Sequence, residues 1–368
     1  MTAPAPRARR ALRFLLLGAG TGVGALVGLA VLATGWHVAT HGRTPPISDA
    51  SGRPVPGSIA SLERISLGGV PQWVLIRGRS TRNPVVLFLH GGPGMPAMYL
   101  AHAWQRPLED DFVVVHWDRL GAGKSFFGGI PARYLTVRRL LDNTYELVNI
   151  LRGRFQQDRI ILVGHSWGSY LGMLAVRERP DLFRAFVGAG QVTGAGRGDT
   201  LAARLQEAFI RREAERRGVP EAARELDEQG RAVVEKWLFR FGGELQGATS
   251  WWPLMRIGLR APEYTLGDVV RMQRGLALYA GAMGYDVPAD TIRVNVTAVQ
   301  VPAFFVAGRH DYTTPSDLVE RYFAGLRAPQ KAFVWFERSA HFPFLEEPAR
   351  FAEVMRQVAA ATAGDRVP

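Results

Sequence analysis

A G-x-S-x-G pattern at residues 164–168 is the strongest chemical signal in the chain. It lies between an apolar run over 160–163, which predicts a β-strand, and a helical pattern over 168–178. A serine on a sharp strand-to-helix turn projects its hydroxyl above the strand ends, and the flanking glycines leave space for that turn. The N-terminus of the following helix also favours negative charge that develops there. We therefore expect Ser166 to be a nucleophile, with an idle serine in a structural turn as the alternative.

A serine hydroxyl is a weak nucleophile unless a base removes its proton, so a histidine and an orienting carboxylate are also needed. In the order serine, acid, histidine, the residues that fit are Asp311, which follows an apolar strand run, and His341, the one histidine after it. His165 and His310 adjoin these residues and are expected to be packing or hydrogen-bonding neighbours. Other acids fit less well because they lie in a helical insertion or open a predicted helix, where capping explains them: Asp286, Asp290 and Asp317.

Acyl transfer also needs backbone N–H donors for the negatively charged oxygen of a tetrahedral intermediate. The sequence HGGPG at 90–94 directly follows a predicted strand, and glycines without β-carbons let a carbonyl oxygen approach the chain closely. We expect the donors of this oxyanion hole to be the N–H groups of Gly92 and of Trp167, the residue after the nucleophile. A glycine-rich turn that binds nothing is the alternative.

The elements that would position these groups follow from the apolar pattern. Short apolar runs bounded by glycine or proline predict strands at 62–67, 73–77, 85–89, 112–116, 160–163, 185–187, 303–307 and 332–336. Helical patterns lie between most of them, at 136–153, 168–178, 315–326 and 347–360. Continuous apolar strands that alternate with helices indicate an α/β fold whose parallel sheet is covered on both faces. The first two runs are expected to form an antiparallel hairpin at one edge.

Residues 191–295 carry no strand signal and are helical and polar, which predicts an inserted helical cap. The core would then consist of residues 59–190 and 296–368. Three tryptophans of the cap, Trp237, Trp251 and Trp252, could face a substrate or could dock the cap on the core, and we favour docking.

The N-terminus carries the pattern of a membrane segment. Residues 14–36 hold no charge and follow an arginine-rich stretch, residues 1–13, and a helix of this length spans a hydrocarbon core. The preceding arginines predict that the N-terminus stays inside and that the rest of the chain faces the periplasm or the outside, as a single-pass membrane protein. A signal peptide cleaved near residues 31–33, which would release a secreted protein, is the alternative. Residues 37–58 would be an extended, proline-rich linker.

Composition excludes several other classes of protein. The net charge of +12 is carried mostly by scattered arginines, which does not favour a nucleic-acid partner. The chain has no cysteine, so disulfides and thiolate chemistry are excluded. GAGKS at 121–125 lacks the first glycine of a phosphate-binding loop, and no metal-ligand spacing is found. We therefore expect no cofactor and no metal, and the oligomeric state is left open.

Taken together, the motifs resemble the α/β-hydrolase fold and, within it, the proline iminopeptidase-like serine hydrolases. The motifs that carry the resemblance are HGGPG at 90–94, WDRLGAGKS at 117–125, GHSWGS at 164–169, GRHDYTTP at 308–315 and SAHFPFLEEP at 339–348. The resemblance implies a mostly parallel eight-stranded sheet and assigns Ser166 as nucleophile, Asp311 as acid and His341 as base. It also implies that a cap carboxylate binds the substrate's free amine. Five cap glutamates are candidates, but solvated helix faces explain them equally well and none is assigned this role: Glu207, Glu213, Glu235, Glu244 and Glu263.

The expected function is therefore that of a serine hydrolase working through an acyl-enzyme, with a small peptide or amide as substrate, as in an aminopeptidase of the proline iminopeptidase type. A carboxylesterase acting on small acyl esters is the alternative, and a non-catalytic binding protein with the same fold is a third. Two departures from the family pattern bear on the substrate. His165 stands where a glycine is common, and the family's tryptophan-glutamate cap motif is missing.

Overall fold

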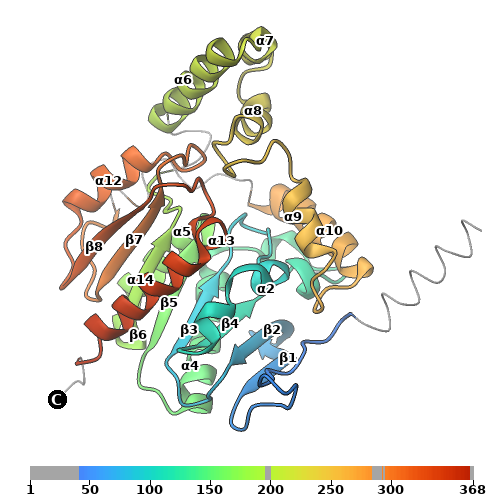
Figure 1. Cartoon of the computed structure of the whole chain (residues 1–368), viewed down its shortest axis with the longest axis vertical. Coiled ribbons are helices and arrows are strands. Elements are labelled where there is room, and N and C mark those ends of the chain that lie inside the picture. Colours follow the sequence, from blue (N-terminus) through green and yellow to red (C-terminus); the bar gives the residue numbers. More distant parts are fainter. Residues whose placement is uncertain (1–40, 195–199, 284–291, 293–294, 365–368) are drawn as a thin grey trace, which may run out of the picture.

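A computed structural model describes residues 41–194, 200–283, 292 and 295–364 (Figure 1). Its centre is one eight-stranded sheet with the order β1-β2-β4-β3-β5-β6-β7-β8. The strands are β1 (Ile59–Leu67), β2 (Val70–Gly78), β3 (Val85–Leu89), β4 (Val113–Trp117), β5 (Ile160–His165), β6 (Phe183–Ala189), β7 (Ala303–Gly308) and β8 (Lys331–Phe336). All eight predicted strands are confirmed.

The strands at one edge of the sheet pair antiparallel, and the remaining strands pair parallel. β1 and β2 form an antiparallel hairpin, as predicted, and β2 also pairs antiparallel with β4. From β4 to β8 every pairing is parallel. The central strands β3, β4 and β5 are buried along their whole length, because helices cover both faces of this part of the sheet. The carboxyl ends of the parallel strands therefore meet at one edge, where the predicted site residues lie.

Helices form a layer on each face of the sheet (Figure 1). One apolar cluster joins the sheet to α4 (Val137–Phe155), α5 (Trp167–Glu178) and α12 (Ser316–Gly325). A second cluster joins the opposite face to α2 (Ala101–Trp104), α3 (Arg106–Glu109), α13 (Pro343–Glu346) and α14 (Pro348–Ala361). The four predicted core helices are thus present as α4, α5, α12 and α14. The α4 helix begins where its apolar stripe begins, and the hydroxyl of Thr136 accepts a hydrogen bond from the N–H of Arg139 at its start.

The segment between β6 and β7 contains further helices, here called the cap: α6 (Thr200–Arg217), α7 (Pro220–Gln229), α8 (Val234–Phe241), α9 (Trp252–Gly258) and α10 (Leu266–Ala282). Helices α6, α7 and α8 share an apolar cluster of their own and project beyond the sheet (Figure 1). Trp237 is fully buried in that cluster, so it packs inside the cap and does not dock the cap on the core. Trp251 lies against Phe239, with the two rings tilted, and packs on the apolar cluster of the second sheet face, as the docking prediction favoured. Trp252, in contrast, is 58% exposed.

The predicted membrane segment, residues 14–36, lies outside the described residues. Within the described ranges, no helix combines the length and the apolar character that a membrane crossing requires. The described part of the predicted linker is held against the folded domain. Its N–H groups at Gly42 and Arg43 both donate to the carbonyl oxygen of Pro262, and Arg77 donates to Thr44 and to the carbonyl of Pro45.

Candidate active site

Ser166 lies on the turn between β5 and α5, in a backbone conformation that is rare for a residue with a side chain. Its φ is 52° and its ψ is −128°. The turn is this tight because Gly164 lets the chain fold back: a β-carbon there would lie 2.6 Å from the Cα of Ser169. The N–H of Ser166 donates to the carbonyl of Ala189 at the end of β6, and the Ser169 hydroxyl donates to the carbonyl of Ser166. These contacts with β6 and α5 keep the backbone of Ser166 in its strained conformation, as is common at functional sites.

Asp311 and His341 are brought together from the loops that follow β7 and β8. The Nδ1 atom of His341 lies 2.9 Å from Oδ2 of Asp311, and both side chains are almost completely buried. Thr314 holds the carboxylate in place, since its N–H donates to Oδ1 and its hydroxyl donates to Oδ2. Burial lowers the pKa of His341, but the charge and hydrogen bond of Asp311, together with Glu244 and Glu346, outweigh it and raise that pKa to about 9.

His341 is also fixed by contacts along its backbone. Its N–H donates to the carbonyl of Glu244 in the cap, and its own carbonyl oxygen lies 2.9 Å from Nε2 of His165. Burial and the neighbouring His341 hold the pKa of His165 well below its usual range, so His165 is neutral and donates this hydrogen bond. The interpretation of His165 as a hydrogen-bonding neighbour is confirmed.

The serine turn and the histidine meet at the end of β6. Ala189 accepts the N–H of Ser166, and the next residue, Gly190, packs directly on the imidazole of His341. A β-carbon at Gly190 would lie 2.8 Å from Nδ1 of His341, so only glycine leaves room for the ring. The rings of His165 and His341 are also 4.8 Å apart. The structure thus brings Ser166, Asp311 and His341 to one place.

The loop after β3 lies against Ser166 on its other side. A β-carbon at Gly91 would lie 2.8 Å from the Cβ and 3.3 Å from the Oγ of Ser166. Gly92 has a φ of +112°, where a side chain would meet the backbone of the following residues. Among the described residues, the N–H groups of Gly92 and Trp167 donate to no acceptor, and Trp167 is the first residue of α5. Both predicted donors are therefore free to bind an oxyanion.

Arg119 holds this loop in shape. Its Nη2 donates to the carbonyl oxygens of Gly91 and Pro93, and its guanidinium lies 5.1 Å from the centroid of the Trp167 ring. The side chain is fully buried, and burial lowers its pKa to about 10. The Trp117-Asp118-Arg119 sequence is thus a structural element that borders the site.

Of the three competing acids, the structure describes one, Asp317. Asp286 and Asp290 lie outside the described residues. The expectation that Asp317 caps α12 is wrong, because the helix begins at Ser316 and no side chain caps it. Asp317 is instead in the first turn, where the helix dipole favours a negative charge.

The five cap glutamates that could bind a substrate amine differ in their surroundings and in their distance from the site. Glu213 is paired with Arg216 and Arg217, and Glu263 is buried against His102. Glu244 lies beside His341: its carbonyl accepts the His341 N–H, and its carboxylate accepts the hydroxyl of Thr313. Burial raises the pKa of Glu244 to about 7 despite the opposing effects of His341 and Thr313. Glu207 and Glu235 lie on α6 and α8.

Sequence reasoning missed the buried polar network that joins the cap to the core. The Nζ atom of Lys124 donates to Asp268 at 2.7 Å and to the carbonyl of Glu263 at 2.8 Å, and the hydroxyl of Tyr264 donates to Asp118. Lys124 belongs to the GAGKS stretch, whose only notable sequence feature was its likeness to a phosphate-binding loop. A pairing between residues 144 positions apart leaves no local signal.

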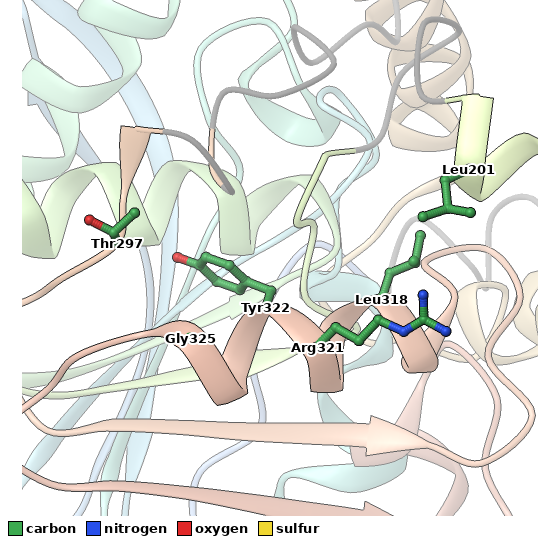
Figure 2. Close-up of a pocket in the computed structure, with 6 residues that line it drawn as sticks. All are labelled: Leu201, Thr297, Leu318, Arg321, Tyr322 and Gly325. Atoms are coloured by element: carbon green, nitrogen blue, oxygen red, sulfur yellow. The ribbon is translucent and has the colours of Figure 1, made fainter.

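Other hollows and clusters do not coincide with these residues. A hollow of about 370 Å³ lies beside α12. Figure 2 labels the six residues that line it: Leu201, Thr297, Leu318, Arg321, Tyr322 and Gly325. None of the predicted site residues lines it. Within the described part of the chain, no group of three or more acidic, histidine or cysteine side chains is placed to hold a metal ion.

Comparisons with known proteins identify the family and the fold of the chain. Residues 86–354 match the model of a protein family described as the alpha/beta hydrolase family. The probable aminopeptidase YbaC of Bacillus subtilis (strain 168) is 29% identical over 325 residues, which cover 81% of this chain and 96% of that protein. The proline iminopeptidase of Heyndrickxia coagulans is 24% identical over 73% of this chain and 88% of its own length.

A solved structure is similar over most of the chain. The proline iminopeptidase of Mycobacterium smegmatis superposes with a TM-score of 0.62 at 21% identity, covering 82% of this chain and 98% of that one. At this identity, the likeness concerns the fold.

Proposed function

Because the chain belongs to the alpha/beta hydrolase family, we propose that it is a serine hydrolase working through an acyl-enzyme intermediate. The observation that carries the proposal is the buried hydrogen bond between Asp311 and His341, next to the turn that presents Ser166. A nucleophile, a base oriented by a carboxylate, and unbonded N–H donors nearby are the parts that acyl transfer requires.

Each part has one role in the proposed reaction. His341 takes the proton of Ser166 as its oxygen attacks the substrate carbonyl, and Asp311 fixes the imidazole and stabilises its positive charge. The N–H groups of Gly92 and Trp167 bind the oxyanion. His341 then returns the proton to the leaving amine or alcohol. Water repeats the sequence on the acyl-enzyme and frees Ser166.

For the substrate, we propose a small peptide or amide with a free N-terminal residue, as for an aminopeptidase of the proline iminopeptidase type. Supporting this choice, one curated relative is named a probable aminopeptidase and another a proline iminopeptidase, and Glu244 supplies a buried carboxylate beside His341. The positive charge of a substrate amine would favour ionised Glu244 and hold the N-terminus near the reacting carbonyl. A carboxylesterase for small acyl esters is the second candidate, since the same triad and oxyanion donors would serve an ester.

We also propose that residues 14–36 anchor the chain in a membrane, with the catalytic domain on the outer, periplasmic or extracellular, face. Support comes from the uncharged 23-residue stretch and the arginines before it. A cleaved signal, giving a secreted enzyme, is the alternative.

The substrate proposal is tested with the full chain in mild detergent. Rates are measured on prolyl-p-nitroanilide and on p-nitrophenyl butyrate, with Ser166→Ala as the blank. Preference for the prolyl amide supports an aminopeptidase. Turnover of the ester with the amide untouched would instead make the protein a carboxylesterase.

A further inference from the structure

Exposed apolar side chains are concentrated on α9 and α10 of the cap. Nine large hydrophobic residues are exposed in the described part of the chain, and five of them fall within residues 252–270: Trp252, Met255, Leu259, Leu266 and Val270. Met255 and Leu259 follow Trp252 at helical spacing, and Leu266 and Val270 are one turn apart. These five residues are called the apolar cap face. Its helices lie next to each other, away from α6 and α7 (Figure 1).

Within residues 251–283, which carry the apolar cap face, the exposed charged side chains are all positive. Between residues 251 and 283 the two acids, Glu263 and Asp268, are buried and paired with His102 and Lys124. Three exposed arginines of residues 251–283 form no salt bridge with any described residue: Arg256, Arg260 and Arg274. A surface that is apolar and basic is complementary to an anionic lipid bilayer.

The chain enters the folded domain at this surface. The N–H groups of Gly42 and Arg43 donate to the carbonyl of Pro262, at 2.7 and 3.2 Å, and Pro262 lies between Leu259 and Leu266. Gly42 is six residues after the end of the uncharged stretch 14–36, and an extended chain gains at most about 3.6 Å per residue. A bilayer that holds residues 14–36 therefore lies within about 25 Å of Pro262.

We infer that the apolar cap face rests in the interface of the bilayer that anchors residues 14–36. Interfacial helices bury their apolar side to a depth of about 5–10 Å, while basic residues beside them contact anionic headgroups. This inference rests on the proposed membrane anchor and is independent of the proposed chemistry.

The helices that carry the apolar cap face also contact the loop beside the site through their buried residues. Gly258 of α9 packs on Tyr99, and Tyr279 of α10 packs on Gly94 in the loop that carries the proposed oxyanion donor. Docking of α9 and α10 on lipid would therefore fix the part of the cap that covers this loop.

The absence of native cysteine makes the test direct, because a single introduced cysteine is the only labelling site. Met255→Cys, Leu266→Cys and Val270→Cys are labelled with the fluorophore NBD in the full chain. Ile150→Cys is the matched control, since it is an exposed apolar position on α4. The proteins are reconstituted in vesicles of phosphatidylcholine and phosphatidylglycerol that contain doxyl-labelled lipid. Labelling of Ser166 by a fluorophosphonate checks that each variant is folded.

The inference predicts quenching by doxyl lipid at the three cap positions, at least about twice that at position 150, as expected for a face buried in the interface. Quenching by aqueous iodide should show the opposite order. If the cap positions respond like position 150, the inference is overturned. If they are shielded from both quenchers, the face is covered by protein, either a second copy or residues 14–36, and the inference is also overturned. Failure of the full chain to float with vesicles would overturn the anchor as well, which distinguishes the two proposals.

Discussion

The Nδ1 atom of His341 lies 2.9 Å from Oδ2 of Asp311, and both side chains are almost completely buried. Burial of an imidazole normally disfavours its charged form, yet here the neighbouring carboxylates raise its pKa to about 9. The pair is thus built to stabilise an imidazolium, which forms when a histidine takes the proton of a serine.

The raised pKa of His341 predicts an alkaline pH dependence. The imidazole must be unprotonated to act as a base, so kcat/KM for p-nitrophenyl butyrate should rise with pH and level off above about 9. Glu244→Gln removes one of the negative charges that raise this pKa, so the midpoint should move to lower pH by roughly half a unit or more. Glu207→Gln on α6 is the control and should leave the midpoint in place. An unchanged midpoint in Glu244→Gln would contradict the electrostatic coupling.

The role of Glu244 as an amine-binding group gives a separate prediction. Glu244→Gln should raise KM for prolyl-p-nitroanilide by about 10-fold or more, as expected for loss of a charge-assisted hydrogen bond. KM for p-nitrophenyl butyrate, which has no amine, should stay the same. Equal effects on both substrates, measured at the pH plateau of each protein, would show that Glu244 does not select for the amine.

Gly91 is predicted to be intolerant of even one added methyl group. Gly91→Ala puts a β-carbon 2.8 Å from the Cβ of Ser166, so the nucleophile must move and kcat should fall by about 100-fold. Gly128→Ala is the matched control, because a β-carbon there meets no atom within 4 Å. Steady-state rates on the ester measure both. Normal turnover by Gly91→Ala would mean that Ser166 does not react where the structure places it.

The strained backbone of Ser166 predicts that activity and stability can be separated. Glycine adopts a φ of 52° and a ψ of −128° without the steric cost of a β-carbon. Glycine loses more backbone entropy on folding than alanine does, but the relief of strain is larger. The free energy of unfolding of Ser166→Gly should therefore exceed that of Ser166→Ala by about 1 kcal/mol. Both variants should lack activity. Urea unfolding in a fixed concentration of detergent compares the two. Greater stability of the alanine variant would show that the turn is unstrained.

The buried pair of Lys124 and Asp268 predicts a large effect on stability. Lys124→Met leaves a buried carboxylate without one of its cations and should lower the free energy of unfolding by about 3 kcal/mol. Lys236 pairs with Glu225 at the surface, so Lys236→Met should cost less than about 1 kcal/mol. Similar losses for the two variants would contradict a structural role for the pair between cap and core.

The fold could be predicted from sequence because its strongest signals are local. The apolar runs that form β3 and β5 are each bounded by turn residues, and the glycines around Ser166 indicate a tight turn. The order of the motifs then left one histidine that could follow Asp311, so elimination placed His341.

The remaining features depend on contacts between distant residues. Glu244 was one of five equivalent carboxylates until the fold put its backbone against His341. Lys124 and Asp268 could not be paired because they lie 144 positions apart, the first in the core and the second in the cap. The packing of Gly190 on His341 likewise depends on β6 and the loop after β8 meeting at one edge of the sheet.

The most direct test of the proposed function is the site of reaction with a fluorophosphonate, read by intact mass and peptide mapping of the full chain. We expect a single adduct, located on Ser166, that is absent from Ser166→Ala and forms far more slowly in His341→Gln. A folded protein that forms no adduct, or that carries it on a different serine, would contradict the assignment of this chain as a serine hydrolase acting through Ser166.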